Sequence, residues 1–234
     1  MFNFVKYKNN LHEDSKPIVF SFLAITLLLS SCAKVNPDRN FAPPAAQEPD
    51  PELTSPADIA RALRSGGYIV YVRHGLTKRN ELELEAKSRE TGRFSINDCS
   101  TQRNLSDEGI AEARAAGEQF RRMRLPVSRY MSSRYCRVVQ TARMFSDEIA
   151  YSEALTSDGP VVKQPERIDG VRALLSEKPP AGKNSMLFAH QGIFWEATRL
   201  TVQEGWTVVL KPGNFNRIVA RIAPGDWARL AAVP

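Results

Sequence analysis

The sequence lacks several features that would assign it to a familiar functional class. It contains no internal repeat, and its main apolar run, residues 18–29, is too short to span a bilayer comfortably. Basic residues are spread along the chain without interleaved aromatic side chains, so we expect no nucleic-acid binding. Only three histidines occur, and without a carboxylate cluster beside them they predict no metal site. The composition is otherwise ordinary for a globular protein, and the net charge of +6 suits an anionic substrate or membrane surface.

The first 32 residues have the pattern of an export signal. Three lysines precede the apolar run, which ends at Leu29-Ser30-Ser31-Cys32, a sequence that resembles the lipobox of bacterial lipoproteins. The resemblance implies that residues 1–31 are removed as a signal peptide and that Cys32 becomes the lipidated N-terminus. The alternatives are a plain signal peptide with an incidental cysteine and an uncleaved anchor. Ala33, rather than Asp, follows the cysteine and favours the outer membrane. We therefore expect a protein of the bacterial cell envelope that is lipid-anchored and faces the periplasm.

A proline-rich stretch follows the predicted lipidation site. Residues 32–56 contain six prolines and few large apolar side chains. Such a composition cannot bury a core, and it predicts an extended tether between the membrane and a folded domain. The remaining residues, 57–234, are enough for a single hydrophobic core and form the predicted domain.

Helical and strand patterns alternate through this domain. Ser55 and Pro56 predict the start of a helix, and Gly66-Gly67 predict its end. Residues 75–104 predict an active-site loop that contains a helical piece. The helical piece within this loop covers residues 81–89. The other predicted elements are strands at 68–72, 129–132 and 185–189, helices at 106–123, 137–146 and 192–202, and a hairpin formed by 207–211 and 217–222. Strands separated by helices indicate an α/β fold, a three-layer α/β/α sandwich with a mostly parallel central sheet.

Both histidines that follow the signal peptide stand directly after a predicted strand. The strand at 68–72 continues into Arg73-His74-Gly75, and the strand at 185–189 continues into His190-Gln191-Gly192. Ligands of open α/β sheets bind beyond the carboxyl ends of the strands, so the imidazoles meet at one edge if the two strands are neighbours. An arginine offers planar donors to an oxyanion, and a histidine offers a nucleophile or a base. A single histidine at a strand end is more often structural, whereas two in the same context favour a site.

A third segment, Met131–Ala142, combines a strand end, a turn and a helix start. The free backbone N–H groups and the positive dipole end of a helix N-terminus favour a bound anion there. Arg137 lies on the first turn of this predicted helix. In isolation it would be interpreted as a solvated basic residue, but its position next to a possible anion site makes it a candidate ligand.

Taken together and in this order, the motifs resemble the histidine phosphatase superfamily, which includes the cofactor-dependent phosphoglycerate mutases. The resemblance covers about residues 67–202, and the chain is closer to the small phosphatases of the superfamily. It implies a phosphoglycerate mutase-like fold. The matching residues are Arg73-His74-Gly75-Leu76-Thr77, Asn104–Gly109 with Arg114, Ser132-Ser133, Arg137, Thr141-Ala142, and His190 with Gly192.

The resemblance also implies a mechanism. His74 would attack phosphorus and form a phosphohistidine, which water would then hydrolyse. Arg73, Arg137 and His190 would surround the phosphoryl oxygens and stabilise their negative charge, and the Thr77 hydroxyl would donate to the same oxygens. Neither a metal nor another cofactor is required.

The general acid that protonates the leaving oxygen is left unassigned by the sequence. One branch of the superfamily has an Asp directly after the second histidine, where this chain has Gln191. The other branch uses a Glu from a separate loop. Asp98, Glu166 and Glu204 are the candidates for this role, although carboxylates in such positions are more often simply surface residues.

Two cysteines, Cys99 and Cys136, remain once Cys32 is lipidated. In an oxidising compartment two such cysteines usually pair. Cys136 neighbours Arg137, and Cys99 lies in the long loop that should fold over the site. We therefore predict a Cys99–Cys136 disulfide that pins this loop beside the phosphate pocket.

The leading hypothesis is a lipid-anchored phosphomonoesterase that acts on a small phosphorylated substrate. An alternative from another class is a lipoprotein that keeps the anion pocket but lacks turnover, which the unassigned acid motivates. A mutase that moves phosphate within a small sugar acid is a third hypothesis, and the export signal disfavours it because glycolysis is cytosolic.

Overall fold

The computed structural model describes residues 52–156 and 165–234. All of them belong to the second of the two units into which the chain divides, Glu48–Pro234. The predicted signal peptide, Cys32 and most of the predicted tether therefore lie outside the described residues. No helix in the described part of the chain is long and apolar enough to cross a membrane.

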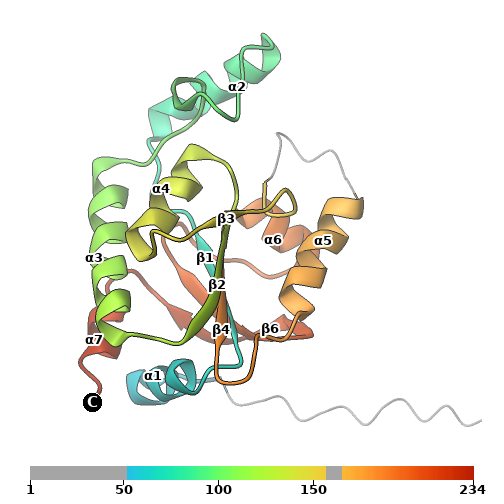
Figure 1. The fold of residues 1–234 in the computed structure, drawn as a ribbon. Coiled ribbons are helices and arrows are strands. Elements are labelled where there is room, and N and C mark those ends of the chain that lie inside the picture. The colour runs from blue at the N-terminus through green and yellow to red at the C-terminus, as the bar shows by residue number, and fades with distance from the viewer. Residues whose placement is uncertain (1–51, 157–164) are drawn as a thin grey trace, which may run out of the picture. The chain divides into compact units, whose positions relative to one another are not determined.

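A single mixed sheet with the strand order β3-β2-β4-β1-β5-β6 forms the centre of this unit (Figure 1). The pairs β1–β4, β2–β4 and β2–β3 are parallel, whereas β5 runs antiparallel to both β1 and β6. The mostly parallel sheet that the alternating pattern predicted is thus confirmed. The strands are β1 (Ile69–Arg73), β2 (Val127–Ser132), β3 (Ala150–Tyr151), β4 (Asn184–Ala189), β5 (Thr207–Lys211) and β6 (Asn214–Ile222).

Helices cover both faces of the sheet, which confirms the three-layer sandwich (Figure 1). Side chains alternate between the two faces of a strand, and each face has its own core. On β1, Val70 and Val72 pack with α1, α3, α4 and α7, whereas Ile69 and Tyr71 pack with α5 and α6. The helices are α1 (Pro56–Ser65), α2 (Leu82–Glu90), α3 (Asp107–Met123), α4 (Cys136–Phe145), α5 (Pro165–Ser176), α6 (Gln191–Thr198) and α7 (Asp226–Ala231).

Local sequence determines where several of these helices begin and end. The Ser55 side chain accepts a hydrogen bond from the backbone N–H of Asp58 at the start of α1, as its position before Pro56 predicted. Gly66 ends α1 with a φ of 74°, a conformation that suits glycine. Ser106 caps α3 in the same way by accepting from the N–H of Gly109.

The sequence did not predict β3, α5 or α7, and it set the end of α6 too late. β3 has two exposed residues, and α7 has six residues with only two buried, so neither carries a usable hydrophobic period. The prediction extended α6 to residue 202. The helix stops at Thr198 because Arg199 adopts a left-handed conformation with a φ of 63°.

Candidate active site

The two histidines lie side by side at the carboxyl edge of the sheet. In the β1–β4 pair Arg73 is opposite Ala189, and the backbone N–H of His74 donates to the Ala189 carbonyl at 3.2 Å. The next residues, His74 and His190, have ring centroids 5.4 Å apart. Parallel pairing of two strands that each end in histidine therefore brings the imidazoles together, as expected for neighbouring strands.

The His74 ring is held in one tautomer. Its Nδ1 atom lies 2.9 Å from the carbonyl oxygen of Gly75, which can only accept, so Nδ1 carries the proton. The Nε2 atom then keeps its lone pair. Burial, followed by the positive charge of Arg137 and more weakly of Arg73 and Arg103, holds the pKa of His74 well below its ordinary value. The ring is thus neutral and nucleophilic at pH 7.

The His190 ring is fixed by a different set of neighbours. Its Nε2 atom lies 3.0 Å from the Ser133 hydroxyl, and its ring makes an edge contact with that of Tyr135. The Tyr71 hydroxyl donates to the His190 carbonyl at 2.8 Å. Burial and the charge of Arg137 lower the pKa of His190 well below its ordinary value. Both histidines are therefore neutral in the free protein.

Two arginines, the partly buried Arg73 and the buried Arg137, flank the histidines. Arg73 ends β1, and Arg137 lies in the first turn of α4, where the strand–turn–helix pattern placed it. Among the described residues, neither the Nε–H of Arg73 nor that of Arg137 has a hydrogen-bond partner, although both atoms are buried. Buried donors without acceptors are costly, so both would be satisfied by an anion. We refer to Arg73, His74, Arg137 and His190 as the floor of the site.

The floor opens into a cavity of about 260 Å³. The cavity is lined by four guanidinium groups, two neutral imidazoles and a single carboxylate. Its net positive charge favours an anion. Within the described ranges, no group of three or more His, Cys, Asp or Glu side chains is arranged to hold a metal ion. The lining residues are Arg73, His74, Glu85, Arg89, Arg103, Tyr135, Arg137, His190, Gln191 and Gly192.

Comparison with known families agrees with this geometry. Residues 69–158, which include three of the four floor residues, match the family model described as the histidine phosphatase superfamily (branch 1). Over this segment the chain is similar to the superfamily. Its sheet, with helices on both faces, is the phosphoglycerate mutase-like fold that the sequence motifs implied.

Several solved structures are similar to this chain, although no curated protein matches it. The protein histidine phosphatase SixA complexed with tungstate is 13% identical with a TM-score of 0.46, and the match covers 68% of this chain and 98% of SixA. Phosphoglycerate mutase from Thermus thermophilus is 20% identical with a TM-score of 0.40, covering 67% and 98%. The Rv3214 protein from Mycobacterium tuberculosis is 15% identical with a TM-score of 0.41, covering 61% and 90%.

Two predicted site residues, Thr77 and Glu204, bind one another next to Arg73 of the floor. The Thr77 hydroxyl donates to Glu204 Oε1 at 3.0 Å, and the Thr77 backbone N–H points to Oε2 at 3.3 Å. Arg73 donates to the same carboxylate at 3.2 Å. Neither Thr77 nor Glu204 lines the cavity. Glu204 therefore orients Arg73 in the free protein, and a contact between Thr77 and phosphate stays a prediction.

The other two acid candidates also lie away from the cavity. Asp98 is exposed and caps the short helix η2 (Cys99–Thr101) by accepting from the N–H and hydroxyl of Ser100. Glu166 is exposed in the first turn of α5. The carboxylate that does line the cavity is Glu85 of α2, which the sequence reasoning did not single out. The predicted helical piece at 81–89 contained this residue, but nothing in its sequence showed which side faces the site.

The loop after His74 is fixed to the surrounding helices by close backbone contacts. The Gly75 N–H donates to the Thr141 hydroxyl of α4 at 3.0 Å, and the Gly205 N–H donates to the His74 carbonyl at 2.8 Å. A Cβ atom on Gly109 of α3 would lie 2.2 Å from the Leu76 carbonyl oxygen, so only glycine permits this approach. These contacts fix the backbone around the His74 ring.

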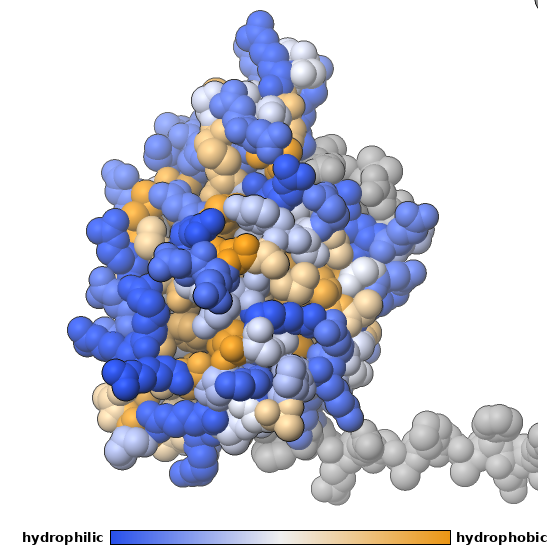
Figure 2. Space-filling view, viewed as in Figure 1, coloured by the Kyte–Doolittle hydropathy of each residue, from blue (hydrophilic) through white to orange (hydrophobic). Residues whose placement is uncertain are grey.

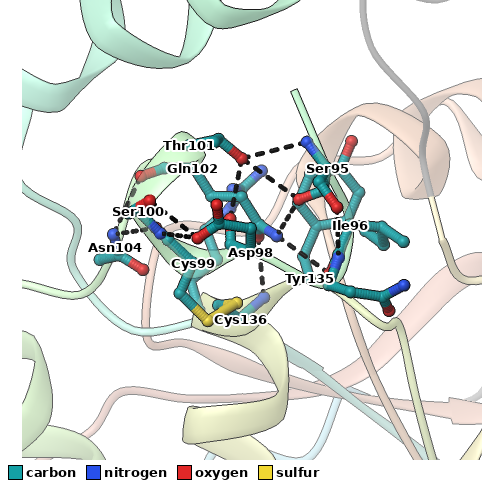
Figure 3. Close-up of a disulfide and its surroundings, with 12 residues drawn as sticks. Ser95, Ile96, Asp98, Cys99, Ser100, Thr101, Gln102, Asn104, Tyr135 and Cys136 are labelled. Atoms are coloured by element: carbon teal, nitrogen blue, oxygen red, sulfur yellow. Dashed lines mark hydrogen bonds between the residues drawn. A yellow bond between two sulfur atoms is a disulfide. The ribbon is translucent and has the colours of Figure 1, made fainter. Parts of the chain in front are cut away.

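Residues 79–104, which we refer to as the cap, comprise η1 (Arg79–Glu81), α2 and η2. None of these three helices buries a residue, and the projecting part of the molecule is mainly hydrophilic in Figure 2. The predicted disulfide between Cys99 and Cys136 joins the cap to the start of α4 (Figure 3). Beside it, the buried Gln102 accepts from the Cys136 N–H and donates to the carbonyls of Ser95 and Ile96.

Proposed function

We propose that the protein hydrolyses small phosphomonoesters through a phosphohistidine intermediate on His74. The observation that carries this proposal is the neutral His74 ring, whose Nδ1–H is committed to the Gly75 carbonyl. Nε2 is therefore available to attack at the edge of an anion-binding cavity lined by Arg73, Arg137 and His190.

The surrounding charges suit phosphoryl transfer. Negative charge spreads over the equatorial oxygens in the transition state, and fixed cationic donors in a site of low dielectric stabilise it most effectively. Arg73 and Arg137 supply two such cations, each with an unused buried N–H. When Nε2 bonds to phosphorus, the ring gains positive charge, and the Gly75 carbonyl stabilises the Nδ1–H that carries part of it.

The test is release of phosphate from an aryl phosphate, in the presence of a metal chelator, by wild type and by His74→Ala. We expect the variant to lose about 10⁴-fold or more in kcat, the scale of removing a covalent nucleophile. Acid quenching of wild type during turnover should trap an acid-labile phosphate on His74 that the variant lacks. Equal rates in the two proteins would exclude the proposal. Phosphate binding that depends on Arg73 and Arg137, without hydrolysis of any ester, would favour the non-catalytic lipoprotein instead.

We also propose that the domain acts at the cell envelope, lipidated at Cys32. The sequence pattern of residues 1–31 supports this location. Cys32→Ser is expected to move the protein from the membrane fraction to the soluble fraction of lysed cells and to abolish labelling by a radioactive fatty acid. An unchanged distribution and unchanged labelling would contradict lipidation.

A further inference from the structure

Glu85 projects from the cap into the cavity above the floor. Its side chain is 15% exposed, and it is the carboxylate among the described residues that line the cavity. One carboxylate oxygen accepts from Arg137 at 3.0 Å and from the Arg103 N–H at 2.7 Å, and the other accepts from Arg89 at 3.0 Å. An acidic side chain inside an anion-binding cavity competes with the ligand, so its presence there requires a reason.

Arg137 is the group for which Glu85 and a phosphoryl group compete. Its guanidinium is 8% exposed and would be an uncompensated buried charge without Glu85. Burial alone would raise the pKa of Glu85, but Arg137, the Arg103 N–H and Arg89 together hold that pKa below its ordinary value. Glu85 is therefore the anion that neutralises Arg137 while the site is empty.

A bound phosphomonoester changes this balance. The dianionic phosphoryl group draws the Arg137 guanidinium away from Glu85, and the unpaired Arg137 Nε–H provides a donor for it. Glu85 then loses its main cationic partner and gains a negative neighbour, and both changes favour its protonated form.

We propose that Glu85 is the proton donor to the leaving group, becoming protonated when the phosphoryl group displaces it from Arg137. This inference rests on the function proposed above. It also assigns the acid role to a residue that lines the cavity, which Asp98, Glu166 and Glu204 do not.

The position of the cap suits this role. In an in-line displacement the leaving oxygen departs on the side of phosphorus opposite the nucleophile. His74 lies at the carboxyl edge of the sheet, and α2 stands beyond that edge (Figure 1). The leaving group is therefore directed toward the element that carries Glu85.

Atoms and electrons balance in both steps of this reaction. The Nε2 lone pair of His74 forms the N–P bond, the P–O bond to the leaving group breaks, and its oxygen takes the bonding pair and the Glu85 proton. An alcohol and a Glu85 carboxylate result. In the second step water attacks phosphorus, Glu85 takes a proton from the water, and the N–P bonding pair returns to Nε2.

The experiment compares Glu85→Gln with Glu83→Gln, an equal change of charge at an exposed position of the same helix. Each is assayed with para-nitrophenyl phosphate, whose leaving group needs little protonation, and with β-glycerol phosphate, whose alkoxide needs a proton. We expect Glu85→Gln to lose about 10²–10³-fold in kcat on the alkyl ester but less than about tenfold on the aryl ester. Glu83→Gln should match wild type on both.

Binding of inorganic phosphate separates this role from a structural one. Glu85→Gln should be inhibited by phosphate at concentrations several-fold lower than wild type, because Arg137 no longer pairs with a carboxylate. Equal losses on both esters, or weaker inhibition by phosphate, would show that Glu85 only positions Arg137 and would overturn the proposal. Unchanged rates on both esters would also overturn it. If wild type hydrolyses neither ester, it is the proposed function that fails, and the Glu85 step fails with it.

Discussion

The floor and the cap of the active site are held in place by different kinds of interaction. The floor follows strands whose side chains are buried in two hydrophobic cores, and backbone hydrogen bonds to Ala189 and Gly205 fix His74 from both sides. The cap instead depends on ion pairs, on Arg89 stacked 3.6 Å above the Phe94 ring, and on one disulfide.

The difference separates two requirements of the proposed reaction. Bond formation at phosphorus needs a nucleophile placed to within a fraction of an ångström, which a packed sheet provides. Admission of a substrate needs a part that can move at low cost, and elements with few buried apolar contacts open most easily. The buried floor and the polar cap meet these requirements separately.

Replacement of Arg137 tests the floor and should have the largest effect. Arg137→Met removes a buried donor to the phosphoryl oxygens and is expected to lower kcat/KM for an aryl phosphate by about 10²–10³-fold. Arg143→Met, an exposed change on the same helix, is the control and should leave activity within about twofold. A loss of activity no greater than that of the control would show that Arg137 does not bind the phosphoryl group.

The same variant should change the pH profile. Because burial and then Arg137 lower the pKa of His74 below 6.5, the wild-type ring stays neutral, and kcat/KM should hold as the pH falls through 6.5. Removal of one positive neighbour raises that pKa, so the acid limb of kcat/KM should move to higher pH in Arg137→Met. The measurement is kcat/KM against pH for both proteins. A limb that stays in place or moves to lower pH would contradict this account of the His74 environment.

Removal of the disulfide tests the cap and should have the next largest effect. The two cysteines are 37 residues apart in sequence, and replacing both by serine is expected to lower the free energy of unfolding by roughly 3–4 kcal/mol on the chain-entropy model. Because the sheet and not this link holds His74 and His190, KM for an aryl phosphate, whose leaving group needs little protonation, should rise more than kcat falls. Denaturant titration and steady-state kinetics measure the two effects.

Reducing agent should reproduce these effects in wild type and leave the Cys99→Ser, Cys136→Ser double variant unchanged. Two free thiols in oxidised, folded protein would show that the link is not formed. A fall in kcat with unchanged KM would show that the cap and the floor are not separable.

A smaller effect is expected from the contact between the nucleophile loop and α4. Thr141→Val keeps the shape of the side chain but leaves the buried Gly75 N–H without its acceptor, at a cost of about 1–3 kcal/mol in the free energy of unfolding. The Thr141 hydroxyl also donates to the carbonyl of Arg137, four residues earlier. Thr91→Val at the exposed end of α2 removes the same kind of bond, to Lys87, and is the control; it should change stability by less than about 0.5 kcal/mol. Thermal or denaturant unfolding distinguishes the two. Equal effects would mean that the Gly75 contact adds nothing to the floor.

The sequence predicted the floor better than the cap, for a physical reason. The strand containing Val70 is buried on both faces, so its apolar run is continuous, and the polar residues after it mark the sheet edge. His190 follows an equally buried strand, and the parallel pairing of the two strands places His190 beside His74. The cysteine pairing was also predicted, because few partners were possible.

The orientation of α2 could not be predicted. A helix that buries no residue has no hydrophobic face to reveal which side points inward, so Glu85 was indistinguishable from Glu83. Glu204 was selected as an acid candidate because pairing with Arg73 and Thr77 is invisible in a sequence. Tertiary contacts, not local pattern, decide which carboxylate reaches the cavity.

The register of β1 against β4 has a consequence for how misfolding of this protein can be detected. Side chains alternate between the faces of a strand, so a slip of one residue would turn one histidine away from the other. A compact form with slipped strands would keep its helices and give a normal far-ultraviolet circular dichroism spectrum. If the proposed hydrolysis holds, such a form would be inactive on phosphate esters, so specific activity would detect slipped strands that the spectrum does not.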